Sequence, residues 1–474
     1  MGDHTATPSL YAVHSVPGPL MQRCVSMHDI ICSDDVSNTE NLLCCVALNE
    51  SRLSGPPPSH HLQSRTAQPR IYEQEVPMST PSLPYDVWDI VFEHSEGDKR
   101  TLMHCSLVCE TWASLSQRRL FTTLTYSRRS VGTPRLFAQF LASTPRIAAH
   151  VRSLTISKRG EDVTIDTLTS MIHLLPNLRV LHLRLLAIVD TYDVKGPDSL
   201  PQGHTHRLTS FKWWDCAATD RALYTLLGCF SSITHLELSN SNPVRRGLIC
   251  LPGVPPDAIP SHLSVERLSV RDFPMTIVSS LVRRSRMSTR LNSAEFLTSQ
   301  DVQEQLGAML CTITSLRHFQ LLWRRGTDKV QHLGRLRLAQ CTSLVTLHFT
   351  LLGVTFVTQG AGAWLLQILD QVAPHLPRSL RVMRLGLVVP RKWSVMEASS
   401  ASENVINIWA ADNTWAEIDR RLLNFPSWAR LEFVSAAAPY EPFEREDVHA
   451  VRAYMRDRLP GVAGQGWVSL FEDI

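Results

Sequence analysis

Cysteines at helical spacing are the first residues that could carry chemistry. Cys105 and Cys109 lie four residues apart, so one helical face could offer two thiolates to a metal ion. No histidine nearby completes such a site, and none of the 11 cysteines belongs to a CxxC or zinc-finger pattern. We therefore expect the pair to be free thiols in the protein core, in a reducing compartment.

Glycine-rich and nucleophile motifs do not indicate an enzyme either. Gly360-Ala361-Gly362 precedes a predicted helix and shares two glycines with a dinucleotide-binding loop, but the third glycine is missing. The sequence contains no GxSxG, P-loop or HExxH motif. We expect no catalytic residue, no metal and no cofactor.

Clustered arginines could bind phosphate, because paired guanidinium groups hold it through parallel hydrogen bonds. Such clusters are also common as solvated charge at helix carboxyl ends. The net charge is only +3, so no overall field favours nucleic acid or an anionic membrane as a partner. The clusters are Arg245-Arg246, Arg283-Arg284-Arg286, which fits the helix-end description, and Arg324-Arg325.

The apolar segments of the chain are short. The longest, such as Leu42–Leu48, are far below the roughly 20 residues of a membrane-spanning helix. Residues Met1–Leu20 lack the charged start and apolar centre of a secretion signal. We expect a soluble protein of the cytoplasm, the nucleus or both.

After Thr133 the order apolar-x-x-apolar-x-apolar recurs, in most cases after roughly 25 to 36 residues, with helical segments between. One strand and one helix per period is typical of leucine-rich repeats. We expect an α/β solenoid with parallel strands on one side and helices on the other. The predicted strands are Val151–Ile156, Leu178–Leu183, Leu208–Trp213, Ile233–Leu238, Val265–Val270, Leu291–Phe296, Leu316–Leu321, Leu344–Phe349 and Leu380–Leu385. The predicted helices are Ile165–Leu175, Asp220–Cys229, Met275–Arg284, Asp301–Leu310 and Trp364–Val372.

These repeats are irregular. Regular leucine-rich repeats carry Asn or Cys eight positions after the first leucine, where the side chain bonds to the backbone of the turn. Only Cys216 conforms. We therefore expect turns that are held individually and a variably curved stack.

Between Ser82 and Tyr126 the apolar residues predict three short helices. In the first, Val87, Trp88, Val91 and Phe92 share one face. Three helices in about 40 residues make a core too small to be robust alone, so we expect a partner to cover it. The residues predicted on buried faces of the following segment are Leu102, Leu107, Val108, Trp112 and Leu115.

The segment from Leu83 to Phe121 resembles an F-box. Leu83-Pro84-Tyr85-Asp86 matches its Leu-Pro-x-Glu opening, and Cys105-Ser106-Leu107-Val108-Cys109-Glu110-Thr111-Trp112 matches its second half. Leu120-Phe121 matches the terminal Leu-Phe that is common in fungal members. Asp86 replaces the usual Glu, and Glu110 stands where Lys or Arg is common. The whole layout is similar to F-box proteins of mushroom-forming fungi.

The resemblance implies a non-catalytic substrate receptor of a Skp–cullin–F-box ubiquitin ligase. The unit would dock to a Skp-family adaptor, and through it to cullin, while the repeats bind a client protein. Alternatives are that its apolar residues pack on the repeat domain, or that the chain is a scaffold outside the ligase. The implied adaptor-contact residues are Leu83, Pro84, Val87, Val91, Leu107, Val108 and Trp112.

In a stacked sheet, the strand residues that do not face the helices line the concave face. Trp and Arg are common in binding hot spots. We therefore predict client contacts at Arg184, Lys212, Trp214 and Arg271. The alternative is that a loop covers Trp214 and that the cations are solvated.

The sequence divides into four parts. Residues 1–81 are rich in Ser, Pro and His and are predicted to be a disordered tail, with a short helix possible at Asn41–Leu53. Residues 82–126 are the F-box-like unit, and residues 127–392 are the predicted solenoid. Residues 393–474 are an atypical cap, with predicted helices at Val405–Leu423 and Glu446–Arg458 and a strand at Ala429–Val434.

Overall fold

Parallel strands dominate the protein. The computed structural model describes residues 83–127, 130, 132–158, 162–190, 206–240, 259–298, 303–324, 333–352, 361–388, 414–426, 429–436, 445–464 and 468–470. A 12-stranded sheet runs through them, and each strand pairs in parallel with the strand before and after it in the sheet order. A second, three-stranded parallel sheet consists of β3 (Asp162–Thr164), β5 (Ala187–Val189) and β7 (Ala217–Ala218).

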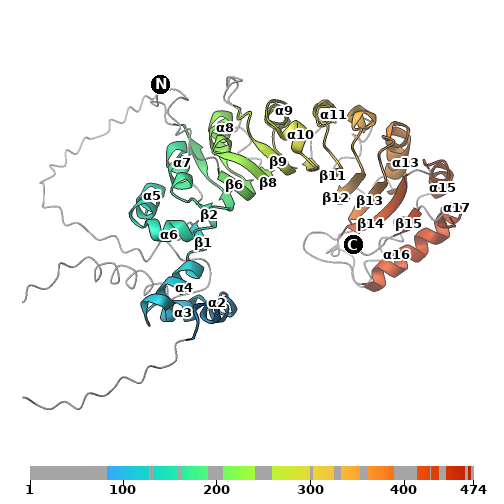
Figure 1. Ribbon diagram of the computed structural model, residues 1–474. Coiled ribbons are helices and arrows are strands. Elements are labelled where there is room, and N and C mark those ends of the chain that lie inside the picture. Colours follow the sequence, from blue (N-terminus) through green and yellow to red (C-terminus); the bar gives the residue numbers. More distant parts are fainter. Residues whose placement is uncertain are drawn as a thin grey trace, which may run out of the picture.

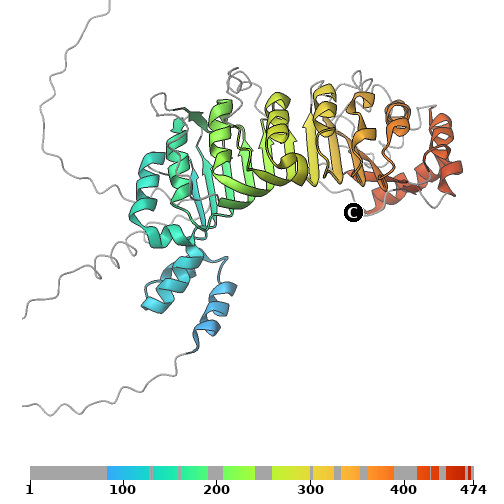
Figure 2. The ribbon, with the colours of Figure 1, turned by 45° about the horizontal axis from the view of Figure 1, so that its top comes forward.

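The large sheet forms the inner side of an arc (Figures 1 and 2). Its strand order follows the chain. The strands are β1 (Thr123–Ser127), β2 (Ser153–Ser157), β4 (Val180–Arg184), β6 (His206–Trp214), β8 (Phe230–Ser239), β9 (Ser264–Arg271), β10 (Ser293–Thr298), β11 (His318–Arg324), β12 (Thr346–Leu352), β13 (Val382–Val388), β14 (Arg430–Ala436) and β15 (Val468–Leu470).

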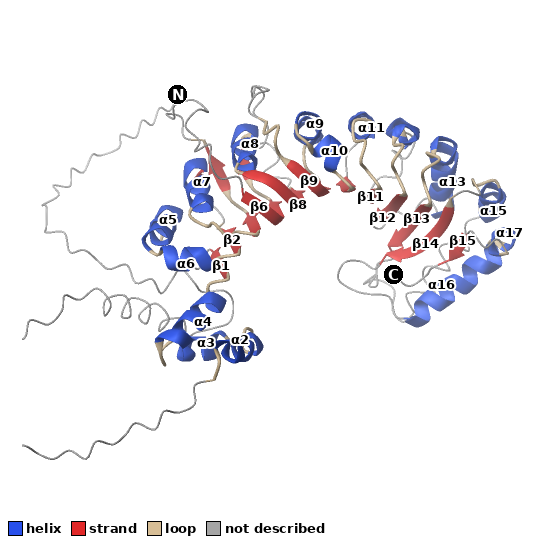
Figure 3. Cartoon of the chain, viewed as in Figure 1, coloured by secondary structure: helices blue, strands red, loops and turns tan. Residues whose placement is uncertain are grey.

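Helices cover the outer side of the arc (Figure 3). Threonines start several of them: the hydroxyl of Thr164 accepts the N–H of Thr167, and that of Thr219 accepts the N–H of Ala222. The helices that follow the first strand are α5 (Pro134–Ser143), α6 (Pro145–His150), α7 (Ile165–His173), α8 (Asp220–Gly228), α9 (Met275–Arg284), α10 (Met287–Arg290), α11 (Gln303–Leu310), η6 (Leu338–Gln340), α13 (Ala361–Val372), η7 (Ala373–His375), α15 (Trp415–Leu423), α16 (Arg445–Arg458) and α17 (Pro460–Ala463).

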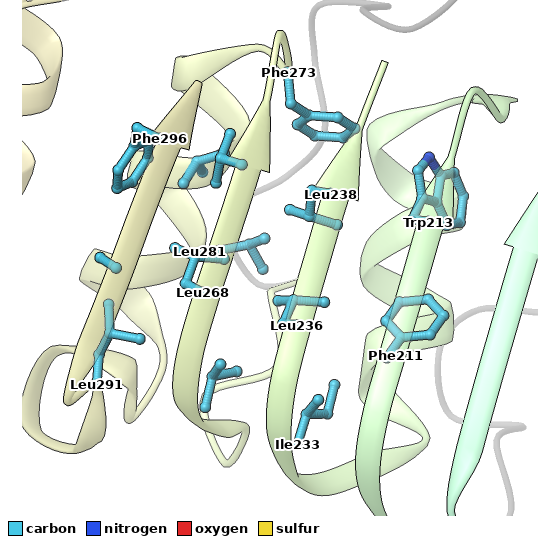
Figure 4. Packing of buried hydrophobic residues seen from close by; sticks show 14 of the residues in the cluster. Phe211, Trp213, Ile233, Leu236, Leu238, Leu268, Phe273, Leu281, Leu291 and Phe296 are labelled. Atoms are coloured by element: carbon cyan, nitrogen blue, oxygen red, sulfur yellow. The ribbon is translucent and has the colours of Figure 1, made fainter. Parts of the chain in front are cut away.

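The core lies between the sheet and the helices. Successive strand residues point to opposite faces, and the register aligns equivalent residues of neighbouring strands into rows. Leu181, Phe211, Leu236 and Leu268 form one such buried row, and several of its members appear side by side in Figure 4.

Side chains at the start of the strands tie neighbouring turns together. The hydroxyl of Ser315 donates to the carbonyl of Leu291 at 2.8 Å, and that of Ser343 donates to the carbonyl of Thr314 at 2.6 Å. The two acceptors occupy different positions of the repeat, so these bonds join individual pairs of turns. Serine hydroxyls at a different position of the repeat provide the cross-links.

At the ends of the strands, backbone N–H groups form further hydrogen bonds between neighbouring strands. Leu185 and Asp215 adopt left-handed backbone conformations, with φ of 58° and 52°, and each donates its N–H to the next strand at 2.9 Å. This conformation costs a leucine about 1–2 kcal/mol, so the hydrogen bond helps to hold Leu185 in place. The Cys216 thiol donates to the carbonyl of Trp214 two residues earlier.

The α/β fold with a large parallel sheet is confirmed. A strand overlaps each of the nine predicted strand segments, and a helix overlaps each of the five predicted between them. Residues 405–413 of the predicted helix Val405–Leu423 lie outside the described residues, and the helix that is described, α15, spans Trp415–Leu423. The predicted tail of residues 1–81 and the helix at Asn41–Leu53 also lie outside the described residues.

Close packing around Gly307 predicts a stability effect. A Cβ added to Gly307 in α11 would lie 2.1 Å from the carbonyl oxygen of Arg335, whereas one added to Gly228 in α8 has no neighbour within 4 Å. We expect Gly307→Ala to lower the free energy of unfolding by about 1–3 kcal/mol. The matched change Gly228→Ala should be neutral or slightly stabilising. Thermal unfolding of the two variants tests this, and equal melting temperatures would contradict it.

Candidate protein-binding surfaces

Three helices precede the first strand: α2 (Tyr85–His94), α3 (Lys99–Cys105) and α4 (Glu110–Leu120). Pro84 occupies the N-cap of α2, where its missing N–H has no cost. Asp98 starts α3 because its carboxylate accepts the N–H groups of Arg100 and Thr101. The fully buried apolar residues of this small interior include Phe92, Leu102 and Leu115.

Aromatic contacts and an ion pair hold α2 against α4. The ring of Trp112 packs edge-on against Trp88 and Phe92, with centroids 4.6 and 5.6 Å apart. Arg119 donates from Nη2 to both the carboxylate and the carbonyl of Asp89 at 2.7 Å. These contacts fix the orientation of α2, and with it the side chains that α2 turns outward.

Exposed apolar side chains of α2, of the residue Leu83 before it and of the turn between α3 and α4 form what we call the apolar surface. The most exposed are Leu107 and Val108, at 58% and 62%, in the turn between α3 and α4. Seven of the ten exposed large hydrophobic side chains in the described part of the chain belong to this small unit, so the exposure is concentrated there. They are Leu83, Tyr85, Val87, Ile90, Val91, Leu107 and Val108.

Most of the predicted adaptor-contact residues belong to the apolar surface. Trp112 does not, because it is half-buried against α2 and supports the surface from inside. Pro84 is exposed beside Leu83. Sequence reasoning missed Tyr85 and Ile90. The spacing of Leu83, Val87 and Val91 at every fourth position, with Ile90 beside them, is a signal that could have revealed this outer face.

Two predictions about buried residues in this unit are corrected. Leu107 and Val108 do not lie on buried faces, because α3 ends at Cys105 and they fall in the exposed turn. Cys105 and Cys109 do not share a helix face: Cys109 is the exposed N-cap of α4, while Cys105 is partly buried and its pKa is raised by burial. No group of three or more potential metal ligands occurs in the described residues.

The second candidate surface is the concave face of the large sheet. Equivalent positions of neighbouring strands align into polar rows, alternating with the buried rows. The central row runs through Thr125, Thr155, His182, Lys212, Glu237, Ser269, Glu295, Gln320, His348, Arg384 and Glu432.

The four predicted client-contact residues come together on this face. The Lys212 ammonium lies 5.1 Å from the ring centroid of Trp214, and the Arg184 guanidinium lies 5.9 Å from it. Glu237, which is 4% exposed, pairs with Lys212 at 3.5 Å and with Arg271 at 3.7 Å. These residues, Arg184, Lys212, Trp214, Glu237 and Arg271, are called the Trp214 cluster below.

The Trp214 cluster differs in part from what the sequence indicates. Trp214 is half-buried, and its indole N–H is buried without an acceptor among the described residues, so the ring is less open than predicted. Arg271 also contacts Glu295 at 3.6 Å, so this cation is not simply solvated. The buried Glu237 that joins two of the cations was not predicted as a contact residue.

One of the three arginine clusters lies on the outer layer of the described structure. Arg283 and Arg284 are exposed in the last turn of α9, on the outer layer, as expected for charges that face the negative end of a helix. Arg245, Arg246 and the side chain of Arg324 lie outside the described residues, as does Arg325.

Histidines of the concave face are surrounded by positive charge. Burial, followed by the charge of Lys212, lowers the pKa of His182, although Glu237 opposes this. Burial, followed by the charges of Arg317, Arg384 and Arg267, lowers the pKa of His318. Burial and the charge of Arg384 lower the pKa of His348 to about 4.

Comparison with known proteins does not identify the chain. The sequence matches no model of a known protein family, and no curated protein is significantly similar to it. Within the described residues, no helix is both long and apolar enough to cross a bilayer.

The lowered pKa of His348 predicts that acid weakens the fold. An unfolded histidine titrates near pH 6.5, so below that pH the unfolded chain binds a proton that folded His348, with a pKa of about 4, does not. The free energy of unfolding should therefore fall as the pH drops from 6.5 toward 4, by about 2 kcal/mol at pH 5 from this residue. Above pH 7 the effect vanishes.

Denaturant unfolding at pH 7 and pH 5 measures this difference for the native chain and for His348→Gln. The glutamine variant should lose less stability on acidification. Equal losses would show that His348 is already protonated when folded at pH 5.

Proposed function

We propose that the chain is the substrate receptor of a Skp–cullin–F-box ubiquitin ligase. In this function, α2–α4 are an F-box that docks to a Skp-family adaptor, and the curved sheet with its helices is a degenerate leucine-rich-repeat solenoid that holds a client. The chain performs no reaction itself. It brings a client lysine close to a conjugating enzyme recruited through cullin.

The apolar surface is the observation that supports this proposal most. Leu83, Val87 and Val91 are each more than a third exposed in the structure and do not pack on the sheet, so the alternative that they are buried against the repeats is not favoured. Burying each such side chain against a partner is worth roughly 1.5–3 kcal/mol. A unit with so small an interior gains stability from a partner that covers this surface.

A scaffold outside the ligase is the second candidate. It would use the same docking surface or the concave face without delivering ubiquitin. Co-purification of cullin and accumulation of a client after depletion of the chain support a ligase receptor. Adaptor binding without either result would support the scaffold.

Removal of the first exposed side chains tests the docking assignment. We expect Leu83→Ala with Pro84→Ala to reduce co-purification of the Skp-family adaptor by about tenfold or more, because apolar contact area is lost. Both residues are exposed, so the fold should survive the change.

Leu136→Ala with Leu423→Ala is the matched control, since both leucines are exposed on α5 and α15, away from the three-helix unit. Adaptor recovery with this control should equal that of the native chain. Unchanged recovery with the Leu83 and Pro84 variant would refute the docking assignment.

A further inference from the structure

We propose that the concave face of the large sheet binds an extended, acidic segment of the client, an assignment that rests on the receptor function proposed above. The occupant is a stretch of protein rich in Asp and Glu. The charges of the face, and the way they are already paired, point to this class of ligand.

Positive charge exceeds negative charge on this face. Alternation along the strands identifies which side chains are concave, and six of those described are Lys or Arg while three are Glu. The cations are Arg184, Lys212, Arg267, Arg271, Arg384 and Arg430, and the carboxylates are Glu237, Glu295 and Glu432.

Each of these carboxylates is already neutralised within the protein. Glu237 is buried between Lys212 and Arg271. Glu432 accepts a hydrogen bond from Nε of Arg384 at 2.7 Å and lies 3.4 Å from Nε of Arg430. With Glu295 paired to Arg271 as well, the negative groups are satisfied internally, and the surplus left for a ligand is positive.

Arg184 and Arg267 carry much of that surplus. Among the described residues, neither has a carboxylate within ion-pair distance, and both side chains are exposed. They lie on β4 and β9, while Arg384 lies further along the sheet on β13. Burial lowers the pKa of His318, and the charges of Arg317, Arg384 and Arg267 lower it further.

The spacing of these cations suits an extended chain. β4 and β13 are separated by seven strand-to-strand steps in the sheet order. At roughly 4.8 Å per step this is about 34 Å, the reach of about ten residues in extended conformation. A peptide of that length that crosses the strands could place carboxylates near Arg184, Arg267 and Arg384 in turn.

Nucleic acid fits this face less well than an acidic peptide. Single strands are held by open aromatic rings on which bases stack. Trp214 is the only Phe, Tyr or Trp at the described concave positions, it is half-buried, and Arg184 and Lys212 already contact its ring.

Peptide binding by the full-length chain alone tests the assignment. The probes are fluorescein-labelled 12-residue repeats of Glu-Ser, Gln-Ser and Lys-Ser and a labelled 12-nucleotide single-stranded RNA, measured by fluorescence anisotropy at increasing NaCl. The Glu-Ser probe should bind most tightly, and more weakly as salt rises. Equal binding of the three peptides, or tighter binding of RNA, would overturn the assignment.

Paired variants locate the binding. Arg184→Gln with Arg267→Gln should weaken binding of the Glu-Ser probe by about a hundredfold, roughly tenfold for each lost charged contact. Arg221→Gln with Arg283→Gln makes the same change in net charge on α8 and α9 of the outer layer and should have no effect. Equal losses in both variants would exclude the concave face.

Adaptor capture by the same preparations separates the two proposals. Intact capture without binding of the Glu-Ser probe would overturn the acidic-client assignment alone. Binding of the probe without adaptor capture would support the concave site and overturn the docking assignment.

Discussion

Each strand of the large sheet forms its backbone hydrogen bonds with the preceding and the following strand of that sheet. This constraint fixes the register from β1 to β15, so that one position of each strand–helix unit always aligns with the same position of the next. A row of leucine and phenylalanine, such as Leu181, Phe211 and Leu236, is buried under the helices, while the row beside it, with His182, Lys212 and Glu237, lines the concave face. The properties of that face are therefore set by one residue per strand in each row.

The two ends of the structure differ in how far their apolar side chains are buried. At the far end, α16 packs against β15 and α17 packs against α15 and α16, and Met455, Leu459 and Val462 are buried. At the near end, α2–α4 enclose only a small interior and leave Leu83 and Val108 exposed. The contrast suggests why a second polypeptide would bind at the near end: the energy of covering the apolar surface is still available there.

The parts of the fold that follow local patterns could be predicted from sequence, and the parts that depend on distant contacts could not. Strands with the spacing of Leu178, Leu181 and Leu183 were found because alternation is a property of neighbouring residues. The pairing of Glu237 with Arg271 joins residues 34 positions apart, and no local pattern indicates it. Leu107 and Val108 were misplaced for a related reason: helix ends depend on capping contacts that apolar spacing does not report.

The proposed docking of α2–α4 to an adaptor through the apolar surface can be observed on the backbone amides. Hydrogen–deuterium exchange of the full-length chain, measured with and without a purified Skp-family adaptor, tests it most directly. We expect slower amide exchange within residues 83–108 when the adaptor is bound, with exchange in the sheet strands unchanged. Adaptor binding that leaves exchange of residues 83–108 unaltered, or that protects the concave strands instead, would contradict it.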